Sequence, residues 1–249
     1  MEFIVVLICL ALQKLWPEGA AYHQNTWFAP YFAWVKAQAQ KFSAWKGVLS
    51  IVVVVVPVLL VLLLLSTALR GPVGHLLLGV LVLWYCLGFD SLKTGSKSSV
   101  GELFAIGYQQ VFAMIFWYAL VGPWGVGLYY TLIQLRLILE KNEVEYKDIL
   151  PLVIRAQGIM DWVPVRLLGI SFALVGHFSV LFPLWLKELP GKIDHTQDYV
   201  MDWGLKSIEL TKPNEQETTQ TAAAQSLLDR SVILWLVALA LISVGSWIS

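Results

Sequence analysis

The segment from Val48 to Leu69 restricts the fold more than any other part of the sequence, because it contains no charged residue. As an α-helix it would measure about 33 Å, enough to cross a hydrocarbon layer about 30 Å thick. Arg70 to Pro72 breaks the run, and Val73 to Phe89 is then predicted to return through the membrane as a second span. The whole chain is 58% hydrophobic and 14% charged, outside the range of ordinary soluble domains. These features predict a membrane protein that begins its spanning region with a helical hairpin.

Three further apolar segments follow. Phe104 to Leu139 is longer than one crossing and is interrupted at Gly122 and Pro123, so it predicts either two short membrane segments or one kinked helix. Trp162 to Leu186 predicts the next span, and Ser231 to Ile248 the last. The expected number of crossings is therefore four to six. The fold class that this predicts is all-α: a polytopic transmembrane helical bundle with a broken Gly-Pro segment.

The remaining parts of the chain are assigned by composition. Residues 1–12 are apolar but too short to span, which favours a tucked or interfacial helix. Residues 13–47 interleave aromatic residues with lysines, a pattern typical of an interfacial amphipathic helix, with a recognition surface as the alternative. Residues 187–230 are polar, and Thr211 to Gln225 predicts a flexible linker. We expect residues 1–249 to form a single integral-membrane domain with interfacial N-terminal helices.

The distribution of charge predicts topology and argues against some functions. The chain has 17 basic and 17 acidic residues, so no net charge favours nucleic acid as a partner. Basic residues precede the first long span and recur between Asp90 and Glu102, which places both regions in the cytoplasm by the positive-inside tendency. Residues 140–160 share that side only if the Gly-Pro segment crosses twice. Cys9 and Cys86 lie in apolar runs and are interpreted as small core residues rather than a disulfide or a metal site.

The stretch from Asp148 to His177 places charged residues inside an apolar region. Asp148 and Asp161 are each followed three residues later by proline, and both are therefore predicted to start helices, with Asp161 capping the helix that enters the membrane. Arg166 would then lie about one turn inside and reach back to the interface. His177 lies too far along the helix to touch Arg166 and is interpreted as a packed, hydrogen-bonded residue rather than a proton relay.

Small residues accompany Arg166 on one side of this helix. At 100° per residue, Gly169, Ala173, Gly176 and His177 share its face. Small side chains allow another helix or a ligand to come close to the backbone. Pro164 and the pair Gly122 and Pro123 are assigned structural roles, like Gly169, Gly176 and His177.

Other polar residues lie in or beside the apolar segments. Glu102 is three residues after Ser99, the spacing of a capping box. At least one of Gln109 and Gln110 is expected to form hydrogen bonds within the bundle. Tyr108, Tyr129, Tyr130 and Gln134 complete this set. The stretch Thr94 to Ser99 lacks the glycine that a phosphate-binding loop needs before its lysine, and the sequence contains no metal-binding or catalytic motif of the standard kinds.

The phrase DWVPVRLLGISFALVGHF from Asp161 resembles the hallmark of the AmpE family of bacterial inner-membrane proteins. Further similarity lies in MEFIVVLICLALQKLW at the N-terminus, GELF from Gly101, VFAMIFWYALVGPWGVGLYY from Val111 and SLLDRSVILWLVALALISVG from Ser226. The resemblance implies a multi-pass protein of the bacterial inner membrane that acts as a sensor or signal modulator. It links the chain to inducible β-lactamase regulation and cell-wall recycling.

The resemblance also implies candidate ligands. The family is associated with a nucleotide such as ATP, and it is similar to the CobD/CbiB enzymes of cobalamin biosynthesis, whose PARL-like phrase corresponds to Pro164 through Leu167. Arg166 would therefore bind an anionic ligand, because a guanidinium holds a phosphate or carboxylate bidentately. The predicted ligand-binding set is Arg166, Asp161, Glu102, Gln109 and Gln110.

The functions that remain open belong to different classes. The first is a non-enzymatic sensor with an anionic small-molecule ligand, a protein partner or a homo-oligomeric state. The second is a membrane-bound ATP-dependent amide-forming enzyme, although the SRDT-like and ESxAEN-like acidic phrases of the enzyme branch are absent from the sequence. A transporter is motivated only by the broken segment at Gly122 and Pro123.

Overall fold

The computed structural model describes residues 2–15, 27–41, 47–69, 71–88, 99–191, 193, 196–211 and 217–248, and every regular element within these ranges is a helix. The elements are α1 (Glu2–Leu15), α2 (Phe28–Lys41), α3 (Val48–Ala68), α4 (Pro72–Cys86), α6 (Val100–Gly107), the π-helix η3 (Tyr108–Phe112), α7 (Ala113–Val121), α8 (Pro123–Lys141), α9 (Leu150–Val175), α10 (Phe178–Glu188), α11 (Thr196–Thr211) and α12 (Glu217–Ile248). The prediction of an all-helical bundle is confirmed. Four described helical stretches have the length and composition to cross a membrane: Val48–Ala68, Val100–Val121, Leu150–Val175 and Thr219–Gly245.

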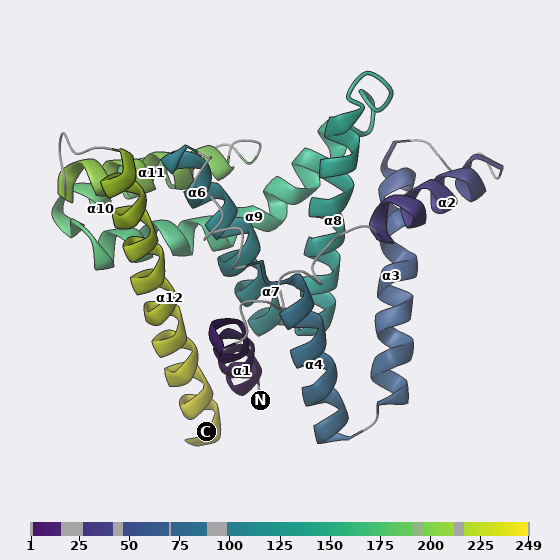
Figure 1. Ribbon diagram of the computed structural model, residues 1–249, viewed down its shortest axis with the longest axis horizontal. Helices are drawn as coiled ribbons and strands as arrows, with labels where there is room; N and C mark the ends of the chain where they lie inside the picture. Colours follow the sequence, from purple (N-terminus) through teal and green to yellow (C-terminus); the bar gives the residue numbers. More distant parts are fainter. Residues whose placement is uncertain are drawn as a thin grey trace.

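α3 lies toward one side of the bundle and α4 nearer its centre, as Figure 1 shows. Gly71 has a φ of 109°, a conformation that favours glycine, and Pro72 then starts α4, where a missing N–H has no cost. α3 packs mainly on α8, and α4 packs on α1 and α8. Much of α3 stays exposed, as expected for a helix that faces lipid. The predicted helical hairpin is observed, but α4 has only 15 residues and is not among the described helices long enough to span, so the second predicted span is not confirmed.

The Gly-Pro interruption separates two helices. α7 ends at Gly122, where φ is 71°, and Pro123 occupies the first turn of α8. α7 and α8 pack against each other and run in opposite directions, so the start of α6 and the end of α8 lie at the same end of the bundle (Figure 1). Two helices rather than one kinked helix are therefore observed, and the first of them belongs to the stretch Val100–Val121 that is long and apolar enough to span. Residues 140–150 consequently lie at the same end as Ser99.

The predicted start of a helix at Asp161 is wrong. α9 is continuous from Leu150, and Asp161 and Pro164 lie inside it. Pro164 removes only one backbone donor, a loss that a helix held by its neighbours tolerates. The cap predicted at Asp148 is displaced by one residue: the observed cap is Ile149, whose side chain forms no capping bond.

The predicted span from Trp162 to Leu186 is also wrong. α9 ends at Val175, Gly176 and His177 interrupt it, and α10 begins at Phe178. In Figure 1, α9 crosses the bundle obliquely, whereas α3, α8 and α12 run steeply along it. Leu150–Val175 rather than Trp162–Leu186 is thus the apolar helix of spanning length.

The polar segment before the last span is more ordered than its composition predicts. α11 occupies Thr196–Thr211, and α12 begins at Glu217 and continues through the last predicted span. Most of the predicted linker from Thr211 to Gln225 is therefore helical, and only residues 212–216 lie outside the described part. The run of alanines at 222–224 favours a helix, and the Ala224 side chain is buried.

The N-terminal helices pack on the bundle. α1 contacts α4, α7 and α12, and its Val5, Val6 and Cys9 are buried, which agrees with a tucked helix too short to span. Cys86 is also buried and both cysteines are free. α2 buries one side of the helix against α3 and α8, with Phe28, Phe32, Val35 and Ala39 facing inward. Residues 16–26 and 42–46 of the predicted interfacial region lie outside the described part.

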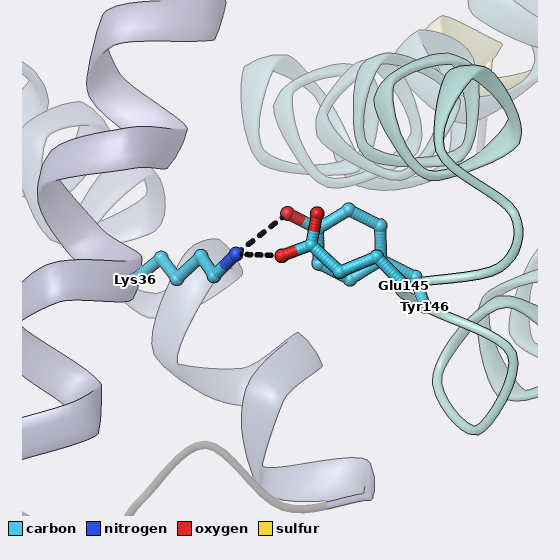
Figure 2. A network of polar contacts seen from close by, with 3 residues as sticks. All are labelled: Lys36, Glu145 and Tyr146. Carbon is cyan, nitrogen blue, oxygen red and sulfur yellow. Dashed lines mark hydrogen bonds and ion pairs between the residues drawn. The ribbon is translucent and has the colours of Figure 1, made fainter.

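A polar contact fixes α2 to the loop after α8. The Lys36 ammonium pairs with Glu145 and donates a hydrogen bond of 2.8 Å to Tyr146 Oη (Figure 2). Partial burial opposes the charge of Lys36, but the hydrogen bonds to Glu145 and Tyr146 outweigh it and raise the pKa of Lys36. The hydrogen bond from Lys36 lowers the pKa of Glu145. Because Glu145 is exposed, the pair orients α2 more than it stabilises the fold.

The most extensive helix packing lies where α11 crosses α9. A Cβ atom at Gly169 would lie 2.4 Å from a ring carbon of Trp203 and 2.7 Å from Trp185, so only glycine fits there. Trp203 is 1% exposed, and its ring also stacks on Tyr199. The expectation that the small face beside Arg166 admits another helix is thus confirmed for α11.

Gly169→Ala is expected to destabilise the protein by about 1–3 kcal/mol, because both indole rings are held by neighbours and cannot give way without shifting α11. The measurement is the unfolding midpoint of purified protein in detergent. Gly245→Ala is the matched control, since its Cβ would have no atom within 4 Å. Equal midpoints for the two variants would show that α11 is not packed against Gly169.

Candidate functional site

A buried carboxylate lies at the centre of the bundle. Asp161 is 1% exposed, and its Oδ1 accepts two hydrogen bonds of 2.6 Å, from Tyr108 Oη and from Tyr129 Oη. The three side chains come from α9, η3 and α8, and both tyrosines are fully buried. An ionisable group inside a spanning helix is costly unless it is paired or hydrogen-bonded, and it is by default a candidate for function. We refer to Asp161, Tyr108 and Tyr129 as the Asp161 cluster.

The helix that carries Tyr108 is irregular at this point. η3 is a single π-helical turn between α6 and α7, and such turns occur frequently at functional sites. The turn also brings Gln110 to the end of α4, where the Gln110 carbonyl accepts a hydrogen bond of 3.4 Å from Gly88 N–H. The Gln110 Oε1 atom is buried without a hydrogen-bond partner among the described residues. The π-turn therefore connects the Asp161 cluster to the C-terminal end of α4.

A second layer of polar side chains lies one turn from Asp161 on α9. Gln157 is 1% exposed, and its Oε1 accepts a hydrogen bond of 3.2 Å from the Arg136 guanidinium. Arg136 also pairs with Glu140 at 2.6 Å. The Nε2 atoms of Gln157 and Gln197 are buried and have no hydrogen-bond partner within the described ranges.

A small polar cavity adjoins the cluster. Its volume is about 60 Å³, and its lining residues are Arg136, Ile154, Gly158, Asp161, Thr196, Gln197 and Asp198. That volume accommodates water or a small ion, whereas pockets for larger organic ligands measure about 300–1,000 Å³. The Asp161 carboxylate can therefore exchange protons or hydrogen bonds with a small polar species that enters between α8, α9 and α11.

Arg166 is held by backbone carbonyls. Its Nε and one terminal nitrogen donate hydrogen bonds of 3.3 and 3.2 Å to Leu189 O, and the same terminal nitrogen donates one of 3.2 Å to Gly191 O. The other terminal nitrogen bonds to Trp162 O at 3.3 Å. The guanidinium lies 4.6 Å from the centre of the Trp162 ring and 5.7 Å from that of Tyr199. Arg166 thus stabilises the C-terminal end of α10, where cations are favourable.

The prediction that Arg166 lies about one turn inside its helix is wrong, because α9 begins at Leu150. Arg166 is 5% exposed, and its guanidinium is held by backbone carbonyls inside the bundle. An anion would reach its guanidinium only if the carbonyls of Leu189 and Gly191 were released. Arg166 as an anion ligand therefore stays a prediction.

His177 does not match the interpretation as a packed residue. It lies exposed at the N-cap of α10, and its backbone carbonyl, rather than its ring, accepts hydrogen bonds from Val180 and Leu181. Gly176 lies beside α11, because a Cβ there would come within 2.6 Å of Ser207 Oγ. The interruption after Val175 explains both positions.

The remaining predicted ligand-binding residues lie apart from one another. Glu102 is exposed and forms the predicted capping box with Ser99, each side chain accepting a backbone N–H at 3.3 Å. Gln109 and Gln110 are partly buried in η3. Of the predicted set, only Asp161 lines the small cavity. Among the described residues, no three His, Cys, Asp or Glu side chains are grouped as a metal site would require.

Two members of the cluster could not be assigned from sequence. Tyr108 and Tyr129 stand out only as polar residues within apolar segments, and they lie 53 and 32 positions from Asp161. The one sequence feature that could have indicated these partners is Asp161 itself, because a carboxylate buried within an apolar helix requires hydrogen-bond donors from neighbouring helices. Arg136 and Gln157 gave no signal of their own.

Comparison with known proteins supports the resemblance seen in the sequence. A family model described as "Regulatory signalling modulator protein AmpE" matches residues 96–247. A curated relative, "Protein AmpE" from Shigella flexneri, is 28% identical over 143 residues, which are 56% of this chain and 50% of that protein. The chain thus spans about half the length of the curated relative that it matches. No solved structure matches the chain.

The matched region contains the candidate site. Residues 96–247 include α6, η3, α8, α9 and α11, and hence the Asp161 cluster and Arg166. The similarity noted at the N-terminus lies outside this match. Because the match covers more than half of the sequence, the chain belongs to the AmpE family of regulatory signalling modulator proteins.

Proposed function

We propose that this protein modulates inducible β-lactamase expression from the bacterial inner membrane, in connection with cell-wall recycling, and that the Asp161 cluster is the part that changes state. The family description supports a membrane signalling modulator. The observation that supports this choice of site is the buried Asp161 carboxylate, which connects α9 to η3 and α8 through hydrogen bonds. The end of the protein that carries Lys36, Lys141 and Lys147 would face the cytoplasm.

α9 provides a route from the site to the surface. Asp161 ties α9 to η3 and α8, whereas Arg166, five positions later on the same helix, ties it to the end of α10. A change in hydrogen bonding at either residue would shift the packing of α9 against α11, its most extensive neighbour. Such bistable contacts between packed helices are a common basis of switching.

Two inputs fit this arrangement. A small polar species in the cavity would compete for Asp161, and an anionic ligand would compete with the Leu189 and Gly191 carbonyls for Arg166. Either species would break hydrogen bonds that Asp161 or Arg166 forms in the described structure. The cavity beside Asp161 is too small for a nucleotide, so the first input is a proton, water or a small ion.

The test is complementation in a bacterial strain that has an inducible β-lactamase and lacks its own copy of this protein. Wild type, Asp161→Asn and Arg166→Gln would be produced at equal membrane levels, with Arg155→Gln as the control because Arg155 is exposed on the same helix. We expect wild type and Arg155→Gln to restore the modulated β-lactamase activity, and Asp161→Asn and Arg166→Gln to lose most of it. Full restoration by both site variants would refute the proposal.

A further inference from the structure

A second cavity lies at the other end of α9, away from the Asp161 cluster. It has a volume of about 440 Å³ and is formed by the C-terminal end of α9, the break at Gly176 and His177, the second half of α11 and the first half of α12. Its lining residues are Val175, Gly176, His177, Ser207, Ile208, Thr219, Ala222, Ala223, Ser226, Leu227 and Arg230. The polar part of this lining consists of a guanidinium, an imidazole and three hydroxyl groups. None of the described residues that line it is acidic.

Arg230 is the charged group of this cavity. Its guanidinium donates hydrogen bonds of 2.9 and 3.3 Å to Ser226 Oγ, one turn earlier on α12. Among the described side chains, no carboxylate forms an ion pair with Arg230. Asp229 is adjacent in sequence but does not line the cavity. A guanidinium with free donors next to hydroxyl groups is suited to phosphate oxygens.

The position of Arg230 along α12 corresponds to the boundary of the hydrocarbon layer. The residues from Ser231 to Ile248 contain no charge, and as a helix they measure about 27 Å, close to the thickness of the hydrocarbon core. Arg230 precedes this stretch directly. The cavity is therefore expected at the level of the lipid headgroups, where a guanidinium is favourable.

An exposed apolar stripe continues from Arg230 along the same face of α12. Ile233, Val237, Leu241 and Val244 follow at helical spacing and are 60%, 51%, 69% and 58% exposed. The described helices leave this stripe uncovered. The cationic cavity thus lies at one end of the apolar stripe on α12. A phospholipid has the same order of parts, because its phosphate lies at one end of its acyl chains.

We propose that α9, α11 and α12 form a binding site for an anionic phospholipid, with its phosphate in the cavity at Arg230 and His177 and an acyl chain along the apolar stripe of α12. Basic pockets between membrane helices recognise lipid headgroups in this manner. A soluble phosphate compound would use the same guanidinium, but it would gain nothing from the stripe. The stripe therefore favours the lipid.

The test uses the full chain, delipidated in mild detergent, and native mass spectrometry to count bound molecules. We expect phosphatidylglycerol to bind at least about tenfold more tightly than phosphatidylcholine, and Arg230→Gln to remove about tenfold of that affinity, as for loss of a charge-assisted pair. Arg155→Gln is the matched control, since it removes an exposed guanidinium of α9 that does not line the cavity.

Two further measurements separate the lipid from a soluble phosphate. The double variant Val237→Ser with Leu241→Ser should weaken phosphatidylglycerol binding while it leaves the unfolding midpoint unchanged, because both side chains are exposed. Glycerol 3-phosphate should bind weakly to wild type. Glycerol 3-phosphate binding as tight as that of the lipid, or equal lipid affinity of wild type and Arg230→Gln, would overturn the proposal.

Discussion

Replacing Asp161 with alanine should lower the free energy of unfolding by about 3–5 kcal/mol, because the change leaves two buried tyrosine hydroxyl groups without their acceptor. Tyr108 Oη and Tyr129 Oη each donate to Asp161 Oδ1 at 2.6 Å, and both tyrosines are fully buried. The measurement is the unfolding midpoint of purified protein in detergent, followed through tryptophan fluorescence.

The isosteric variant makes the interpretation specific. Asp161→Asn keeps one carbonyl oxygen that can accept both hydrogen bonds, so it should cost less than half as much as the alanine variant. Asp148→Ala is the control for removal of a carboxylate, since Asp148 is exposed just before α9. If Asp161→Ala unfolds at the wild-type midpoint, the two tyrosines are not held by this carboxylate.

Arg166→Ala is expected to cost about 2–4 kcal/mol, because the guanidinium donates to three backbone carbonyls in a mostly buried environment. The loss should be concentrated where α10 meets α11. Hydrogen exchange measured by mass spectrometry should therefore rise for residues 185–191 and 199–205, while the exchange of α3 and α4 stays unchanged.

Arg166→Lys separates charge from shape. Lysine keeps the positive charge but cannot bridge Leu189 O, Gly191 O and Trp162 O together, so we expect it to recover only a minor part of the lost stability. Arg155→Ala controls for the loss of an exposed arginine on the same helix. Complete rescue by Arg166→Lys would mean that charge, and not the forked geometry, matters at this position.

The long apolar run of α3 could be predicted from its length, and the turn into α4 from Gly71 and Pro72. At Gly122 and Pro123 the sequence left two alternatives open, because the same residues can either separate two helices or kink one. The start of α9 was misplaced because an aspartate followed by proline resembles a cap, and local sequence does not reveal donors on other helices. The helicity of residues 217–225 was missed because polar composition alone favoured a linker.

The site was only partly accessible to sequence reasoning. Asp161 and Arg166 could be singled out because each is charged within an apolar helix, but their partners come from helices far away in the chain. Two of the three carbonyls that hold Arg166, those of Leu189 and Gly191, belong to a break that the predicted span did not include. Long-range packing decides such roles, and a single sequence does not encode it in any local pattern.

The uneven burial of the spanning helices has a consequence for how this family can diverge. Only 22% of the apolar window of α3 is buried inside the protein, compared with 56% for that of α9. A helix such as α3 needs to remain apolar but requires few particular side chains, so valine, leucine and isoleucine can exchange freely along most of its length. Sequence similarity between distant relatives should therefore be lost in α3 before it is lost in α9. The family match, which begins at residue 96, does not include α3.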